Sequence, residues 1–97
     1  MSNLQSDRAQ ILLAAQSSLL GEVFPSLISV DVSWYAHQIE LKFYIDSEPS
    51  EPDLESVSAI EAEMNAHFPA HDIAIVLAIG HPRPENRGDV CVFARRP

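Results

Sequence analysis

Two stretches of alternating apolar and polar residues, separated by a short connection, constrain the fold more than any other feature of the chain. Apolar side chains occupy every second position in residues 28–34, and the same period returns in residues 39–45. A period of two places the apolar side chains of a strand on one face of a sheet. The connection, Tyr35 to Gln38, is short enough to be a turn. The sequence therefore predicts a hairpin with one apolar face and one polar face.

Two further segments have the apolar spacing of helices. Residues 7–20 carry apolar side chains three and four positions apart, with Ser6 placed as an N-cap and Gly21 placed for a left-handed C-terminal residue. Residues 52–67 follow a Ser50 and Asp53 pattern typical of a capping box, and a proline ends the segment. We expect a helix in each segment.

The remaining strands are expected near the C-terminus. Residues 72–80 are apolar on both faces, which favours a strand inside the sheet over one at its edge. Residues 90–94 are rich in β-forming residues, and strict alternation places Cys91 and Phe93 on one face. The order αββαββ predicts an α+β fold, in which a four-stranded, mostly antiparallel sheet carries both helices on one face.

The face opposite the helices is expected to be open and polar, and Tyr44 is expected to be exposed there. Residues 80–88 are expected to form a mobile hairpin loop. The side chains assigned to the open face are Ser29, Asp31, Ser33, Glu40, Lys42 and Tyr44.

Length and composition predict a single soluble domain spanning residues 1–97, with 46% apolar and 21% charged residues. The longest apolar run, residues 73–79, is far shorter than the roughly 20 residues that cross a bilayer. The first ten residues lack the basic start of a signal peptide. A single cysteine, Cys91, permits no internal disulfide, which is typical of proteins in a reducing compartment. We expect a cytoplasmic protein that does not bind membranes.

Acidic residues outnumber basic ones by 14 to 6, and the formal net charge is −8. Such a field repels nucleic acid and attracts basic partners. Residues 40–63 hold eight acidic side chains against Lys42 alone. This segment is either a solvated surface or a docking patch for a basic protein.

No residue pattern in the chain is typical of a catalytic or cofactor site. His67 and His71 have a spacing seen in metal sites, but Pro69 interrupts a helix between them. Cys91 lies in no known cysteine motif, and the three glycines are isolated, which excludes a phosphate-binding loop. We therefore expect no metal and no cofactor.

Five stretches of the chain resemble a known family. They are residues 18–23 (SLLGEV), 39–46 (IELKFYID), 50–58 (SEPDLESVS), 68–69 (FP) and 92–95 (VFAR). They are similar to small acidic bacterial proteins, the immunity proteins of contact-dependent growth inhibition systems, and the resemblance spans residues 12–95. It implies a non-enzymatic protein that binds and neutralises a toxin domain.

Three hypotheses follow for the function. In the first, an immunity protein binds a basic toxin domain, expected to be a nuclease, because an acidic inhibitor complements a basic substrate cleft. The expected contact residues are Asp46, Glu48, Glu51, Asp53, Glu55 and Tyr44. In the second, a structural or adaptor domain forms homo-oligomers through its open face or an edge strand. In the third, a small enzyme uses His67, His71 and Cys91.

Overall fold

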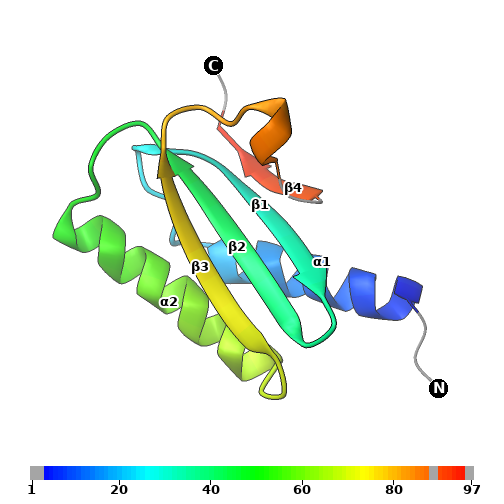
Figure 1. Ribbon diagram of the computed structural model, residues 1–97. Helices are drawn as coiled ribbons and strands as arrows, with labels where there is room; N and C mark the ends of the chain where they lie inside the picture. Colours follow the sequence, from blue (N-terminus) through cyan, green and yellow to red (C-terminus); the bar gives the residue numbers. More distant parts are fainter. Residues whose placement is uncertain (1–3, 88–89, 96–97) are drawn as a thin grey trace.

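The computed structural model describes residues 4–87 and 90–95 (Figure 1). Both long helices lie behind the sheet in this view, so they cover the same face of it. The αββαββ order and the α+β class predicted from the sequence are confirmed. The elements are α1 (Leu4–Leu19), β1 (Leu27–Tyr35), β2 (Gln38–Ile45), α2 (Glu51–His67), β3 (Asp72–Ile79), a 3-10 turn η1 (Pro84–Asn86) and β4 (Val90–Ala94).

The sheet has the strand order β3-β2-β1-β4. Strand β1 is antiparallel to both β2 and β4, whereas β2 and β3 are parallel. The predicted hairpin is present, since Tyr35 pairs with Gln38 across a turn in which Ala36 has a φ of 54°. The sheet is thus mixed and mostly antiparallel, as predicted.

The prediction that residues 72–80 form an interior strand is wrong, because β3 lies at one edge of the sheet. The hairpin already places β1 on one side of β2. The chain then crosses through α2 and adds β3 on the free side of β2, parallel to it, as a helical crossover does. Apolar residues on both faces of a strand do not show whether the strand has a neighbouring strand on one side or on both sides.

The segment after β3 is a crossover over the sheet, not the expected hairpin loop. Strands β3 and β4 lie at opposite edges, so residues 80–87 pass over the face opposite the helices (Figure 1). The expectation of an open polar face is therefore wrong for part of that face: Ser29, Asp31 and Tyr44 are buried.

The core lies between the sheet and the two helices. The inward side chains of β1 and β2 form one cluster with those of α1 and α2, and burial of each large one contributes roughly 1.5–3 kcal/mol to folding. The largest fully buried apolar side chains are Leu27, Val30, Val32, Ile39, Leu41, Phe43, Ile45, Ile60 and Met64.

A bulge in β4 changes the face that its residues occupy. Phe93 pairs with Val30 and Cys91 pairs with Asp31, so Val92 is an extra residue on β4. Phe93 consequently packs against the core, while Cys91 lies on the other face with Asp31. The prediction that Cys91 and Phe93 share a face is wrong for this reason.

The helix ends follow the sequence signals with one exception. Helix α1 begins at Leu4, so Ser6 lies inside the helix and is not its N-cap. Gly21 has a φ of 79° just after α1, a conformation that glycine adopts without strain. Within the described residues, neither helix is long and apolar enough to span a bilayer.

Candidate functional site

The acidic residues expected to bind a partner gather where β2 ends and α2 begins. We call this group the acidic corner. Its members are Asp46, Glu48, Glu51, Asp53 and Glu55. The sequence brings them together because a turn of only five residues, 46–50, separates the two elements.

Asp46, the first residue after β2, is held in place by several contacts. Its backbone N–H donates to Ser26 O at 2.9 Å, and Ser47 Oγ donates to its Oδ1 at 3.2 Å. Arg95 Nη1 donates to Asp46 Oδ2 and to Pro25 O, both at 2.9 Å. The Arg95 guanidinium holds the pKa of the Asp46 carboxyl below its ordinary value. Asp46 is therefore a charged but partnered member of the acidic corner.

Asp53 holds the start of α2. Its Oδ2 accepts from Ser50 N at 3.1 Å, and its N–H donates to Ser50 Oγ at 3.2 Å, which completes the predicted capping box. Ser26 Oγ also donates to Asp53 Oδ2, at 3.3 Å. The carboxylate thus ties α2 to the segment before β1, and its first function is structural.

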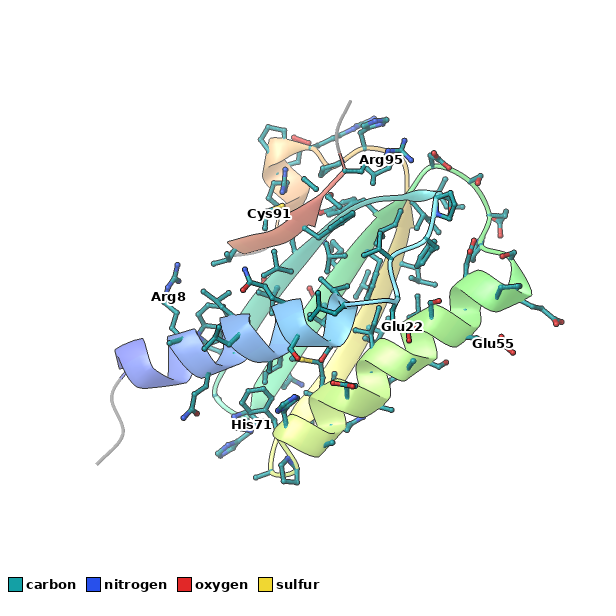
Figure 2. The ribbon with its side chains drawn as sticks, turned by 180° about the vertical axis from the view of Figure 1, so that it is seen from behind. Arg8, Glu22, Glu55, His71, Cys91 and Arg95 are labelled. Atoms are coloured by element: carbon teal, nitrogen blue, oxygen red, sulfur yellow. The ribbon has the colours of Figure 1, made fainter. Side chains whose placement is uncertain are left out.

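The other three members of the acidic corner are exposed. Glu48, Glu51 and Glu55 form no ion pair with any residue that the structure describes. Glu55 points away from the body of the protein in Figure 2. A partner could reach these carboxylates without breaking an ion pair to the part of the chain that the structure describes.

Tyr44 differs from its expected environment. The residue is only 2% exposed, and residues 80–83 line a hollow beside it. Burial raises the pKa of its hydroxyl, and the nearby Asp31 carboxylate adds to the effect. Lys42 Nζ lies 6.0 Å from the centre of the ring. The expectation that Tyr44 is an exposed aromatic side chain is wrong.

An ion pair on the same face, between the buried Asp31 and the partly exposed Arg87, was not predicted. Arg87 Nε and Nη2 each donate to a different oxygen of Asp31, at 2.8 Å. Asp31 is 1% exposed, and this pairing raises the pKa of the Arg87 guanidinium. The contact fastens the crossover segment to β1. The sequence signal was an aspartate between the apolar residues of a central strand. The residues near it in the sequence did not indicate that Arg87 is its partner.

The three residues of the enzyme hypothesis are not brought together. His71 and Cys91 lie at opposite ends of the molecule in Figure 2. His71 packs its ring edge-on against Phe68, with 5.4 Å between ring centres, and Cys91 Sγ donates to Phe93 O at 3.2 Å. The described residues contain no group of three or more side chains able to hold a metal ion.

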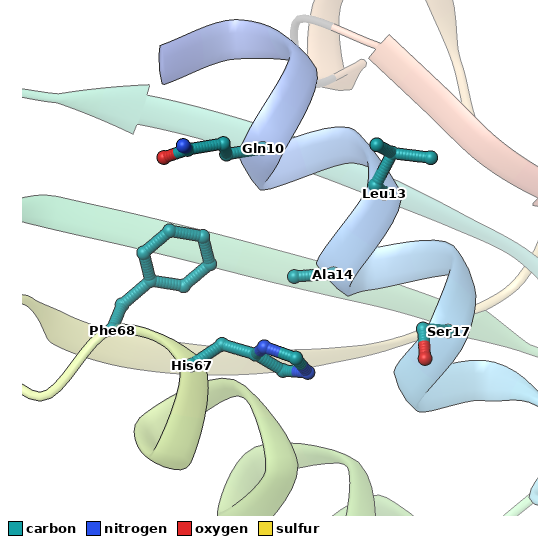
Figure 3. Close-up of a pocket in the computed structure, with 6 residues that line it drawn as sticks. All are labelled: Gln10, Leu13, Ala14, Ser17, His67 and Phe68. Carbon is teal, nitrogen blue, oxygen red and sulfur yellow. The ribbon is translucent and has the colours of Figure 1, made fainter. Parts of the chain in front are cut away.

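His67 lines a shallow hollow between α1 and the end of α2 (Figure 3). A small-molecule site requires polar groups that converge on one point. The hollow has few such groups. The residues around it are Gln10, Leu13, Ala14, Ser17, His67 and Phe68. The arrangement offers a surface for contact and no recognisable chemistry.

Comparison with known proteins identifies the family. No curated protein matches the chain. The family model described as MafI2 immunity protein matches residues 8–97, which is nearly the whole chain. This agrees with the resemblance to toxin immunity proteins seen in the sequence. The chain therefore belongs to the MafI2 immunity protein family.

Proposed function

We propose that this protein neutralises a basic toxin domain, of the nuclease type, by binding it through the acidic corner and not by catalysis. The observation that carries the proposal is the exposure of Glu48, Glu51 and Glu55, which form no ion pair with the described residues, in a chain of the immunity family. The site of action that we propose is the cytoplasm of the cell that makes the protein, as expected for a toxin delivered by cell contact.

The charges of the acidic corner favour fast and selective association. Like charges at a surface create a field that attracts a basic cleft and raises the association rate. Glu51 and Asp53 lie in the first turn of α2, where the helix dipole favours acidic side chains.

The predicted contact residues have different parts in this proposal. Glu48, Glu51 and Glu55 contact the toxin directly, whereas Asp46 and Asp53 add charge while holding the corner in shape. Tyr44 is buried, so we propose that it supports the end of β2 from below.

Two matched double variants test the proposal. Glu48→Lys with Glu55→Lys changes the acidic corner, and Glu22→Lys with Glu85→Lys changes acids outside α2. Each pair changes the net charge from −8 to −4, because each reversal adds two charges. Association with the toxin domain encoded beside this gene is measured by stopped flow over a salt series.

We expect the corner variant to associate about tenfold more slowly at low salt, while the control stays within about twofold of the unmodified protein. The difference should shrink as the Debye length falls to about 8 Å at physiological salt. Equal rates for the two variants would place the contact outside the acidic corner.

A further inference from the structure

The outer edge of β3 carries unpaired backbone groups. Asp72 N donates to His37 O and Gly80 N donates to Ile45 O, both at 2.7 Å, so the even-numbered residues of β3 bond to β2. Successive residues of a strand direct their N–H and C=O groups to opposite sides. No strand in the described part of the chain pairs with the outer side. The residues whose backbone groups point outward are Ile73, Ile75, Leu77 and Ile79.

The same residues place apolar side chains beside this edge. They pair with inward-facing residues of β2, so they lie on the helix-covered face of the sheet. Their cover decreases along the strand: Leu77 is 39% exposed and Ile79 is 59% exposed, whereas their partners on β2, Phe43 and Ile45, are buried. The edge is thus most open next to the acidic corner, where Gly80 bonds to the end of β2.

Helix α2 extends past this edge. It meets β3 at the turn after Phe68 and diverges from the strand toward its own first turn (Figures 1 and 2). Leu54 has the helical spacing of Val57 and Met64, which are buried against the sheet, yet Leu54 is 42% exposed. The apolar side of α2 therefore continues beyond the last strand of the sheet.

We propose that the outer edge of β3 accepts an extended segment of the toxin domain as a fifth strand, an inference that rests on the proposed function. Main-chain hydrogen bonds to a free edge give affinity in this mode of recognition, and side-chain pockets give specificity. The segment carries apolar side chains toward Leu54, Leu77 and Ile79, and basic side chains toward the acidic corner. An apolar centre with a charged rim is the usual anatomy of a specific interface.

The charges of α2 favour a toxin segment over a second copy of this chain. Helix α2 lies beside β3 on one face of the sheet (Figure 1). A second copy that paired through β3 would therefore bring its own α2 close to the α2 of the first copy. Exposed acidic residues occur on both halves of this helix, among them Glu51, Glu55 and Glu63. Two such helices repel each other, whereas a basic partner is attracted.

Amide hydrogen exchange in the free protein and in its complex with the neighbouring toxin domain tests the inference. In the complex, exchange should slow by about tenfold or more at Ile73, Ile75, Leu77 and Ile79, whose N–H groups gain partners. The amides of Ala74, Val76 and Ala78 already bond to β2 and should change much less. The free protein should remain monomeric by light scattering at the same concentration.

Two variants test the edge directly. Leu77→Pro removes an outward N–H without removing a bond to β2, and Ile79→Lys places a charge on the edge. Each should weaken toxin binding by about tenfold or more. The control is Leu20→Lys at an apolar residue that is 78% exposed at the end of α1, and it should bind within about twofold of the unmodified protein.

The outcomes separate this inference from the proposed function. Failure of the unmodified protein to bind the toxin domain would overturn both. Binding without protection of the outward amides, or with full affinity in the Ile79→Lys variant, would overturn the fifth strand and leave the immunity function standing. Protection of these amides in a free protein that is dimeric would assign the edge to a second copy and overturn the inference.

Discussion

The two edges of the sheet are built in different ways. Strand β4 has five residues, contains a bulge at Val92 and is followed directly by Arg95, which bonds to Asp46. Strand β3 has eight residues in an unbroken register with β2, and its only charged residue is Asp72 at the start. Short length, bulges and nearby charges are the means by which soluble proteins keep sheet edges from pairing with other chains. The chain uses these means at β4 and leaves β3 without them.

This difference is informative because both edges belong to one small domain in the same solvent. Two arginines secure the β4 side: Arg87 bonds to Asp31 within β1, and Arg95 bonds to Asp46 at the end of β2. The β3 side has exposed Leu77 and Ile79 instead. The comparison suggests that the β4 side serves stability and the β3 side serves binding. Variants on each side can test that division.

The largest effect on stability is expected for Arg87→Gln. It leaves the Asp31 carboxylate, 1% exposed, without its two-bond partner, although Asp31 keeps other interactions. We expect a loss of about 2–3 kcal/mol in the free energy of unfolding, somewhat below the usual cost of breaking a buried pair. Urea unfolding measures it. The control is Arg83→Gln in the same segment, which should change stability by less than about 0.5 kcal/mol. Equal stability of the two variants would mean that the pair does not secure this side.

A smaller effect is expected at the start of α2, on the β3 side. Ser50→Ala removes one half of the capping box and should destabilise the protein by about 1 kcal/mol. The control is Ser58→Ala at an exposed position inside the same helix, where alanine is neutral or slightly favourable. Thermal unfolding of the two variants gives the comparison. A Ser50→Ala protein as stable as the control would show that the cap does not hold the first turn that carries Leu54.

A still smaller effect is expected for Asp46→Asn. The folded-state pKa of Asp46 lies below its ordinary value because of Arg95, so the pair stabilises the folded state at neutral pH. That contribution is lost as the pH falls through the folded pKa. Since the pair is exposed, we expect a melting temperature less than about 4 °C below that of the unmodified protein at pH 7. The difference should shrink as the pH falls below the ordinary range of a carboxyl group, and a difference that does not shrink in acid would contradict an ionic origin.

Local features of the fold were predictable from the sequence, and long-range ones were not. The hairpin of β1 and β2 and the capping box at Ser50 and Asp53 depend on residues close together in the chain. The ion pair of Asp31 and Arg87 joins residues 56 positions apart, and the sequence does not indicate which arginine pairs with this aspartate. For the acidic corner, the grouping followed from the short turn after β2. The burial of Tyr44 could not be predicted from the local sequence, because residues 80–83 lie beside it and the path of this crossover segment depends on the strand order.

The place of β3 shows most clearly why pattern alone is insufficient. Its apolar residues on both faces predicted an interior strand, and in the free chain that prediction is wrong. The apolar pattern indicates how much apolar surface a strand has. It does not indicate whether the strand or helix that covers this surface belongs to the same chain.

The smallest effect on stability is expected for Ile79→Lys in the free protein, and it tests the division between the two edges most directly. Ile79 is 59% exposed, so its replacement removes little buried apolar surface, and we expect a change within about 0.5 kcal/mol in urea unfolding. Phe93→Lys on β4 is the matched change on the other edge, and it should cost several times more because Phe93 packs against the core. If Ile79→Lys instead destabilises the free protein as strongly as Phe93→Lys, then Ile79 is needed for folding. If it does not, Ile79 is not needed for folding and is free to contact another molecule, as the fifth-strand proposal requires.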